Sequence, residues 1–308
     1  GRMGMKAARK AITETLLKLA REDKTIFALA TDSSGSVTLN DFVRELPSQF
    51  VECGIAEQDA VGIAAGLAAS GLKPFVCGPA SFYATRAAEQ VKVDVAYSHM
   101  NVKVLGVSGG VSYGALGGTH HAVQDVAFMR AVPGLQVILP ADANSAAALT
   151  RALVASPEPA YIRVGRGDVE DIYPENVQVE IGKAITAREG ADAAIIACGE
   201  MVCPSLKAAE LLAKDGMNVR VVDMHTIKPL DVEAVLAAAQ TGKLVTVEEH
   251  SVRGGLGGAV AEVVCQAHPV KMRILGLPDE TLFSGTNKEV FQHYGLTAEG
   301  IAAAVKAL

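Results

Sequence analysis

The sequence predicts an α/β protein made of two doubly wound α/β domains. Short apolar runs, of the length of buried strands, alternate with longer segments whose apolar positions recur at helical spacing. Such alternation is typical of parallel sheets with helices on both faces. It is interrupted at 168–182, an acidic stretch that contains proline, and then starts again. We therefore expect a first domain at 1–167, a linker at 168–182 and a second domain at 183–308.

In the first domain, each expected strand is an apolar run, such as TIFALA at 25–30, bounded by polar or Gly-containing segments. Strands are expected at 25–30, 50–54, 74–78, 102–107, 136–139 and 160–164. Helices, identified by their apolar periodicity, are expected at 5–20, 56–70, 85–99, 123–130 and from 144 onward. The uncharged stretch at 60–72 is too short to span a bilayer and is rich in Gly and Ala, so we expect it inside the protein.

The second domain repeats the architecture of the first without repeating its sequence. Strands are expected at 193–198, 219–223, 243–247 and 272–275. Helices are expected at 205–215, 232–239 and 256–267. This smaller unit has the same alternation of strand and helix, so it is also expected to be an α/β domain.

Composition excludes several classes of protein. The 308 residues include 28 Lys+Arg against 34 Asp+Glu, a net charge of −6, and half of them are hydrophobic. This balance argues against disorder and against nucleic-acid binding, and the shortness of the uncharged stretch at 60–72 leads us to expect a soluble protein rather than a membrane protein. Five scattered cysteines without metal-site spacing favour free thiols in a reducing cytoplasm.

Ligands of open α/β sheets bind beyond the carboxyl ends of the strands, so the residues that follow each strand are the first candidates. They are Asp32, Ser36, Glu57, Phe82, Tyr83, Arg86, His120, His121 and Arg166. If the loops meet at one rim, that rim holds a carboxylate at a helix start, two aromatic rings, a histidine pair and two arginines.

Each candidate also has an ordinary structural explanation. A glutamate in the first turn of a helix, such as Glu57, often serves only as a cap or dipole partner. Beside an apolar interior, however, its carboxyl would have a raised pKa and would be able to transfer a proton. Arg86 has Glu89 within reach as an ion-pair partner, and both aromatic residues at 82–83 are also typical of a core.

Two other features carry weaker signals. His120 and His121 are adjacent and have no evident third ligand, so we expect no metal site, and a neutral histidine that contacts substrate is the better interpretation. The glycine-rich loop at 254–258 opens a helix and has the form of a phosphate cradle, but it lacks the sequence of a known phosphate-binding loop.

The order and spacing of several motifs resemble the transketolase group of thiamine-diphosphate enzymes. They extend over nearly the whole chain: VECGIAEQDA at 51–60, VGIAAGLA at 61–68, SFYATR at 81–86, GTHH at 118–121, LPAD at 139–142, RVGRG at 163–167 and EEH at 248–250. The resemblance implies a pyrimidine-binding domain followed by a transketolase C-terminal domain. The family's third module, which holds diphosphate and Mg²⁺ through a Gly-Asp-Gly motif, has no counterpart in this sequence.

The resemblance therefore implies a split enzyme. The chain looks like the C-terminal subunit of a transketolase whose separate N-terminal subunit supplies the diphosphate site and the Mg²⁺ ligands. Because cofactor sites of this family lie between subunits, an α2β2 heterotetramer is expected. The activity implied is transfer of a two-carbon ketol unit between sugar phosphates.

Roles implied by the resemblance follow position by position. Glu57 matches the glutamate that bonds N1′ of the cofactor's aminopyrimidine, and Tyr83, with Phe82 as the alternative, matches the ring that stacks on it. Asp32 matches a cofactor-contacting aspartate. His120 matches a histidine that handles substrate protons. Substrate contacts are implied for Ser36, Arg86 and Arg166.

Two positions depart from the transketolase pattern. Leu116 replaces an aspartate that reads a sugar hydroxyl, and Ser108 replaces a histidine that contacts phosphate. These departures put the choice of sugar in question and favour an unusual substrate, such as a branched or modified sugar.

Three alternatives remain at this point. A 1-deoxyxylulose-5-phosphate synthase-like enzyme would consume pyruvate, and a 2-oxo acid dehydrogenase beta subunit would couple to lipoyl transfer. A non-catalytic scaffold subunit would not bind thiamine diphosphate with any partner.

Overall fold

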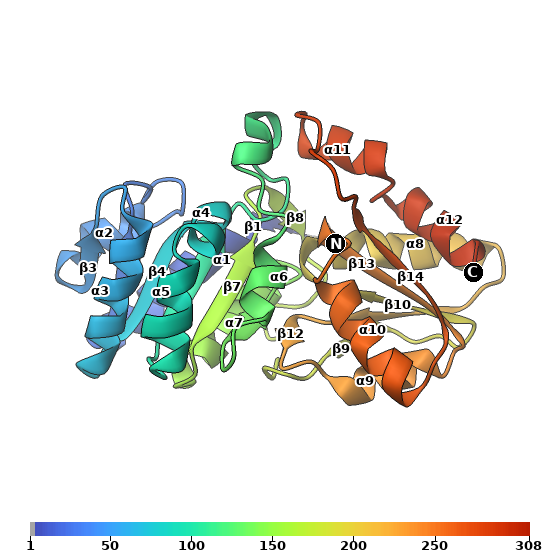
Figure 1. Ribbon diagram of the computed structural model, residues 1–308, viewed down its shortest axis with the longest axis horizontal. Helices are drawn as coiled ribbons and strands as arrows, with labels where there is room; N and C mark the ends of the chain where they lie inside the picture. Colours follow the sequence, from blue (N-terminus) through green and yellow to red (C-terminus); the bar gives the residue numbers. More distant parts are fainter. Residues whose placement is uncertain (1–3) are drawn as a thin grey trace.

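The structure, a computed structural model, describes residues 4–308 and contains two α/β units joined side by side (Figure 1). The first unit is built on a seven-stranded sheet with the order β12-β6-β7-β5-β4-β2-β3. Its strands are β2 (Ile26–Ala30), β3 (Phe50–Glu52), β4 (Lys73–Pro79), β5 (Lys103–Val107), β6 (Gln136–Ile138), β7 (Ala160–Val164) and β12 (Thr226–Lys228). All neighbours in it are parallel except β12 and β6.

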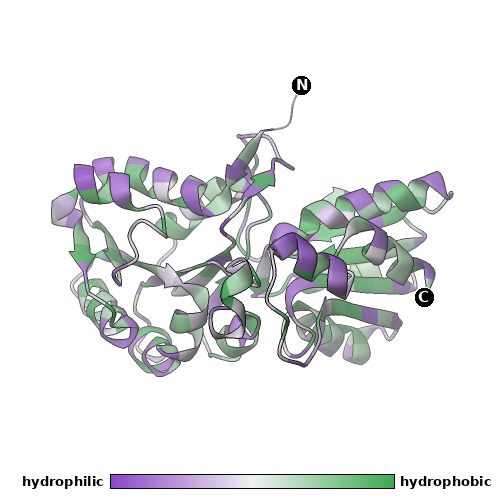
Figure 2. Ribbon diagram, turned by 90° about the horizontal axis from the view of Figure 1, so that it is seen from above, coloured by the Kyte–Doolittle hydropathy of each residue, from purple (hydrophilic) through white to green (hydrophobic). Residues whose placement is uncertain are grey.

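Helices cover both faces of this sheet, as expected. One face is packed by α1 (Ala8–Glu22) and α7 (Ala143–Ala155), whose apolar residues form one core with the strands. The other face is packed by α3 (Glu57–Ala69), α4 (Ala80–Thr85), the π-helical segment η2 (Val91–Tyr97) and α6 (Asp125–Arg130). Figure 2 shows hydrophobic residues on the strands and both kinds of residue on the helices.

The second unit is a five-stranded sheet with the order β14-β13-β10-β11-β9. Its strands are β9 (Ile185–Arg188), β10 (Ala193–Ala197), β11 (Val219–Asp223), β13 (Lys243–Ser251) and β14 (Lys271–Leu277), and β9 alone among them is antiparallel to its neighbour. Its helices are α8 (Val202–Lys214), α9 (Val232–Ala239), α10 (Leu256–Ala267), α11 (Asn287–Tyr294) and α12 (Ala298–Lys306). The prediction of two α/β domains is confirmed.

Several elements differ from the sequence prediction. The helix expected at 85–99 is represented by α5 (Ala88–Gln90) and η2, and it is preceded by α4, which was not predicted and begins directly after β4. The alternating valines of VKVDV at 91–95 fit helical periodicity poorly, and the π-helical turns occur there. Short elements that the periodicity did not predict are α2 (Asn40–Glu45), β9, β12, α11 and α12.

Two strand pairs connect parts of the chain that the sequence separates. The expected linker at 168–182 begins with β8 (Asp168–Glu170), which pairs antiparallel with β1 (Met5–Ala7). Strand β12 lies within the second unit's sequence but extends the first unit's sheet, with Thr226 opposite Ile138. The two domains therefore share backbone hydrogen bonds as well as side-chain contacts.

The described residues include no helix with the length and hydropathy of a membrane span. Of the cysteines, Cys77 and Cys198 are buried, whereas Cys265 is exposed.

A buried carboxyl at the end of β11 gives the fold a specific pH dependence. Asp223 is fully buried, and Oδ2 accepts a hydrogen bond of 2.8 Å from the hydroxyl of Tyr173 in the linker. Burial raises the pKa of Asp223 to about 7, against the opposing effect of that hydrogen bond. The ordinary pKa of aspartate in an unfolded chain is about 3.9. The folded protein thus retains a proton that the unfolded chain releases, and this stabilisation is lost as pH rises through 7.

Asp223→Asn removes this titration, so the fall in Tm between pH 5 and pH 8 is expected to be smaller in the variant than in the wild type. Thermal unfolding followed by circular dichroism at several pH values measures the difference. The exposed Glu233→Gln on α9 is the control and is expected to follow the wild type. Parallel curves for wild type and Asp223→Asn would contradict the assignment.

Candidate functional site

The loops that follow β2, β4, β5 and β7 gather at one edge of the first sheet, because these strands are parallel and neighbouring. The loop after β5 continues into the short 3-10 segment η3 (Gly114–Thr119), which projects at the top of Figure 1 toward the second domain. A Cβ on Gly117 would collide with Ser284 of that domain, so the two domains meet directly at this edge.

Glu57 is the first residue of α3 and is 3% exposed. Its Oε2 lies 2.9 Å from Nη1 of Arg86, which follows α4 and is half exposed. Arg86 thus pairs with Glu57 rather than with Glu89. Within residues 4–308, Arg86 donates a hydrogen bond to the Glu57 carboxylate, and no N–H group of α3 does.

A continuous row of stacked groups extends from this ion pair. The guanidinium of Arg86 lies 4.6 Å from the centre of the Phe82 ring. The ring centres of Phe82 and His120 are 5.5 Å apart, and those of His120 and Tyr113 are 5.3 Å apart, both edge to face. Arg166 then lies 5.0 Å from the centre of Tyr113. With Glu57 at its start, the row brings together five of the residues expected at the site.

The far end of the row is positively charged. Nη1 of Arg166 donates to Oγ of Ser108, 3.3 Å away. Burial lowers the pKa of Arg9 of α1, and the positive charge of Arg166 lowers it further. Arg9 also donates a hydrogen bond to the carbonyl oxygen of Ser36. Guanidinium groups are well suited to bind phosphate oxygens through charge-assisted hydrogen bonds.

Two members of this arrangement were missed in the sequence. Tyr113 lies in the glycine-rich loop, where no spacing distinguishes it. Arg9 precedes the first strand of the sheet, so a search limited to the carboxyl ends of strands does not reach it. In the folded chain α1 brings Arg9 to the same edge.

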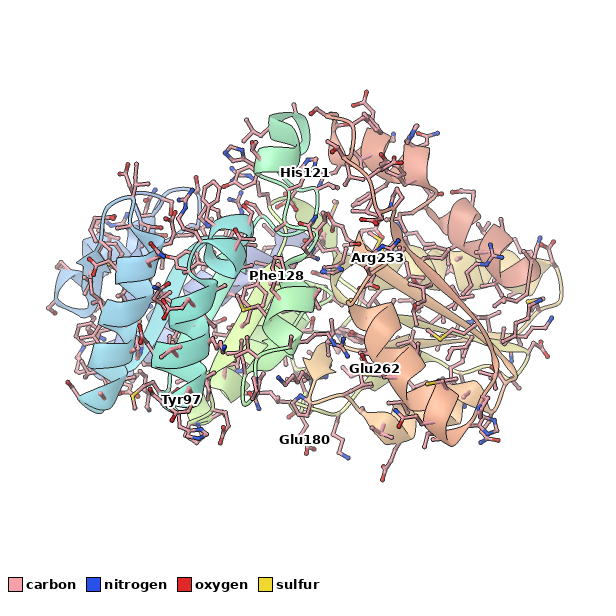
Figure 3. All side chains as sticks on the ribbon, viewed as in Figure 1. Tyr97, His121, Phe128, Glu180, Arg253 and Glu262 are labelled. Atoms are coloured by element: carbon pink, nitrogen blue, oxygen red, sulfur yellow. The ribbon has the colours of Figure 1, made fainter. Side chains whose placement is uncertain are left out.

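His120 and His121 have different environments. His120 is partly exposed, and its Nδ1 lies 2.9 Å from Oγ1 of Thr119. His121, labelled in Figure 3, is buried, and its Nε2 lies 3.0 Å from the carbonyl oxygen of Gly114. His121 therefore holds the loop together, while His120 faces the row. Residues 4–308 contain no cluster of three side chains suited to a metal ion.

Tyr83 and Asp32 occupy other positions. The ring of Tyr83 is fully buried beside Gly78, with its hydroxyl 3.3 Å from Oγ1 of Thr31, and burial raises the pKa of this hydroxyl. Phe82 has the accessible ring of the pair. Asp32 is exposed with φ of +57°, and its N–H donates to Glu52.

The glycine-rich loop at 254–258 is already filled by the protein itself. The N–H groups of Leu256 and Gly257 donate to the carboxylate of Glu248, at 2.6 and 3.0 Å. A Cβ on Gly255 would collide with the same carboxylate. The weak expectation of a phosphate cradle here is therefore wrong, because an internal acid occupies the helix start.

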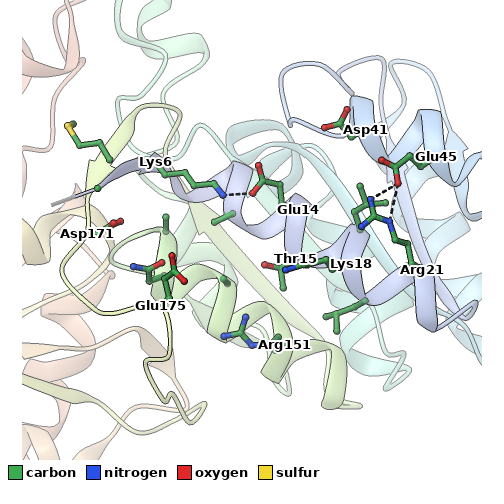
Figure 4. A pocket seen from close by; sticks show the side chains of 18 residues that line it. Lys6, Glu14, Thr15, Lys18, Arg21, Asp41, Glu45, Arg151, Asp171 and Glu175 are labelled. Carbon is green, nitrogen blue, oxygen red and sulfur yellow. Dashed lines mark hydrogen bonds and ion pairs between the residues drawn. The ribbon is translucent and has the colours of Figure 1, made fainter. Parts of the chain in front are cut away.

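Two cavities differ in their relation to the row. One of ≈ 140 Å³ adjoins Phe82 and Thr119, between α4 and the η3 loop. A larger one of ≈ 790 Å³ lies between α1 and α7 and is lined by side chains such as Glu14, Lys18 and Arg151 (Figure 4). Its lining contains none of the residues predicted for the site.

Comparison with known proteins identifies two family domains in this chain. The model of the transketolase pyrimidine binding domain matches residues 5–171, and that of the transketolase C-terminal domain matches 182–301. The chain is 56% identical over 299 residues to an apulose-4-phosphate transketolase subunit of Phocaeicola vulgatus, covering 96% of each protein. It is 39% identical to the 6-deoxy-6-sulfo-D-fructose transketolase subunit of a Clostridium species, covering 96% of this chain and 92% of the relative.

A solved structure described as a split gene transketolase, in an inactive beta4 tetramer, is 37% identical with a TM-score of 0.90. The match covers 98% of this chain and 97% of that one. The chain therefore belongs to the transketolase family and carries that family's pyrimidine-binding and C-terminal domains.

Proposed function

We propose that this chain is the C-terminal subunit of a split, thiamine-diphosphate-dependent transketolase that transfers a two-carbon ketol unit between sugar phosphates. The observation that carries the proposal is the row from Glu57 to Arg166. It places a buried carboxylate at one end, a histidine in the middle and a pair of guanidinium groups at the other end.

The residues present suit the aminopyrimidine of thiamine diphosphate. Glu57 is buried, so its carboxylate is able to bond a ring nitrogen without competition from water. Phe82 supplies an accessible ring beside it for stacking, and Tyr83 fills the core behind. When bound, the cofactor supplies the carbon nucleophile of ketol transfer. The Mg²⁺ and diphosphate ligands are assigned to the partner subunit.

The rest of the row suits a sugar phosphate. Arg9 and Arg166 bind the phosphate, with Ser108 and Ser36 holding the two guanidinium groups in place. His120 lies between them and the Glu57 end, where it donates or accepts a proton at a sugar hydroxyl. Leu116, 55% exposed on η3, offers no hydrogen bond to that sugar.

The proposed substrate is a ketose phosphate of unusual form, of which apulose 4-phosphate is the leading candidate. The relative that is 56% identical is named for that compound. An apolar residue at position 116 favours a sugar that lacks a hydroxyl at the place where most transketolases read one.

The partner subunit is proposed to dock on the helices nearest the viewer in Figure 1. Large apolar side chains are exposed there on and beside α3, η2 and α6: Ile55, Val93, Tyr97 and Phe128. Tyr97, 81% exposed, and Phe128 are labelled in Figure 3. An α2β2 assembly in which the partner subunit packs on these helices would cover these side chains.

The function is tested by purifying the chain with its diphosphate-binding partner and supplying thiamine diphosphate and Mg²⁺. We expect ketol transfer from apulose 4-phosphate to an aldose phosphate, and none from either subunit alone. Consumption of pyruvate would instead favour a 1-deoxyxylulose-5-phosphate synthase-like enzyme, and coupling to lipoyl groups a 2-oxo acid dehydrogenase. No binding of thiamine diphosphate by the complex would leave a scaffold role.

Glu57→Gln is expected to lower turnover by about 100-fold or more, because proton transfer at the aminopyrimidine loses its carboxyl partner. Steady-state assay of the complex measures it, and an unchanged Tm shows that the fold is intact. Glu89→Gln, at an exposed acid that takes no part in the row, is the matched control. Near-normal activity of Glu57→Gln would exclude Glu57 from the reaction.

Arg9→Ala is expected to raise KM for a phosphorylated substrate about tenfold with little change in kcat, because a charge-assisted hydrogen bond to phosphate is lost. Lys10→Ala, at the adjacent exposed position of α1, should leave KM unchanged. Equal effects of the two variants would indicate a general loss of positive charge and refute a phosphate site at Arg9.

A further inference from the structure

A buried arginine lies where the two domains meet, beside Gly109 in the loop that leads to Tyr113 and His120. Arg163 of β7 is 5% exposed, and its Nε lies 3.2 Å from Oδ2 of Asp125. Its Nη2 donates to the carbonyl oxygens of Ala122, at 2.9 Å, and of Glu249 in the second domain, at 2.5 Å. The hydroxyl of Tyr161 donates to the same Asp125 carboxylate at 2.7 Å.

Two acids of the second domain flank this arginine, and each accepts a hydrogen bond from a loop of the first. Oε1 of Glu200, in the short 3-10 segment η4 (Gly199–Met201), accepts from the N–H of Gly165 at 3.0 Å. Oε1 of Glu249, in β13, accepts from the N–H of Val111 at 2.8 Å. Both acids therefore bond to main chain and not to a side chain of the row.

The two bonded peptides are next to the functional residues. Gly165 directly precedes Arg166 in the sequence, and Val111 begins the stretch that carries Tyr113 and His120. The two loops are also tied to each other, since the N–H of Gly109 donates to the carbonyl oxygen of Val164 at 2.9 Å.

The two acids approach the loops so closely that residues larger than glycine would not fit at positions 165 and 110. A Cβ on Gly165 would collide with the Glu200 carboxylate, and a Cβ on Gly110 with that of Glu249. Gly110 also has φ of +61°, which side chains rarely adopt. The glycines of these loops thus allow the second domain's acids to reach the first domain's backbone.

We propose that Glu200 and Glu249 are positioning residues, by which the second domain fixes the loops that carry Arg166 and His120. The inference rests on the proposed function of those two side chains. It gives the C-terminal domain a part in substrate binding and turnover, although none of its side chains belongs to the row.

A second explanation is that the acids only neutralise Arg163. Burial raises the pKa of Glu249 to about 8, and also raises that of Glu200, although the charge of Arg163 opposes both shifts. Oε1 of Glu249 accepts the hydrogen bond from the N–H of Val111 whether the carboxyl is charged or neutral. What the loop requires is an acceptor, which glutamine provides and alanine does not.

The experiment compares Ala and Gln at both positions in the complete complex. Glu200→Ala is expected to raise KM for a phosphorylated ketose about tenfold, because Arg166 loses its fixed position. KM for hydroxypyruvate, a ketol donor without phosphate, should not change. Glu249→Ala is expected to lower kcat about tenfold through His120. Both Gln variants should stay within about twofold of the wild type.

A second readout does not depend on activity. Amide hydrogen exchange of the full chain should become faster at 108–122 in Glu249→Ala and at 164–168 in Glu200→Ala, and should return to wild-type rates in the Gln variants. Exchange in β11 should be the same in all variants, which shows that the second domain remains folded.

Gln variants as impaired as the Ala variants would overturn the proposal, because charge would then be what matters. Ala variants with wild-type kinetics and exchange would overturn it as well. If the wild-type complex shows no ketol transfer, the proposed function fails. Positioning is then decided by exchange at 108–122 and 164–168 alone: faster exchange in the Ala variants, restored by Gln, supports it, and unchanged exchange overturns it.

Discussion

Arg163 carries a permanent positive charge into a buried region between the two domains. The contact between the domains and the sequence of the loops beside it both depend on that buried charge. A buried guanidinium is tolerated only when its charge and its donors are matched, since removal from water costs several kcal/mol. Asp125 supplies the charge, and carbonyl oxygens from both domains accept its hydrogen bonds. Both domains must therefore contact this side chain. The loops beside it contain glycine where a larger residue would collide with Arg163 or with the acids of the second domain.

The large elements of the fold could be predicted because their signals are local. Apolar periodicity identifies β7 at 160–164 and α10 at 256–267 with the bounds that the structure has. The pairing of β12 with β6 could not be predicted, because three residues carry no periodicity and their partner is far away in the sequence. Tertiary hydrogen bonding determines such a strand, and no local pattern reports it.

Some residues of the candidate site could likewise be predicted from the sequence, and others could not. Glu57, Arg86, Phe82, His120 and Arg166 were found because they follow strands whose ends must meet. Tyr113 and Arg9 were not, since a ring in a flexible-looking loop and a cation on a first helix have common structural uses. Exposure also separates Phe82 from Tyr83, which are adjacent and alike in sequence. Neighbours on a helix point about 100° apart, and only the packed structure shows which of the two side chains points inward.

Strand β12 belongs to the second unit in sequence, but it protects the edge of the first unit's sheet. With β12 in place, β6 is an inner strand of the first sheet; without the second domain, β6 would become an open edge with unpaired peptide groups. A fragment ending in the linker would thus be exposed to edge-to-edge aggregation. The pairing of β12 with β6 therefore couples the stability of the first sheet to the folding of the second domain.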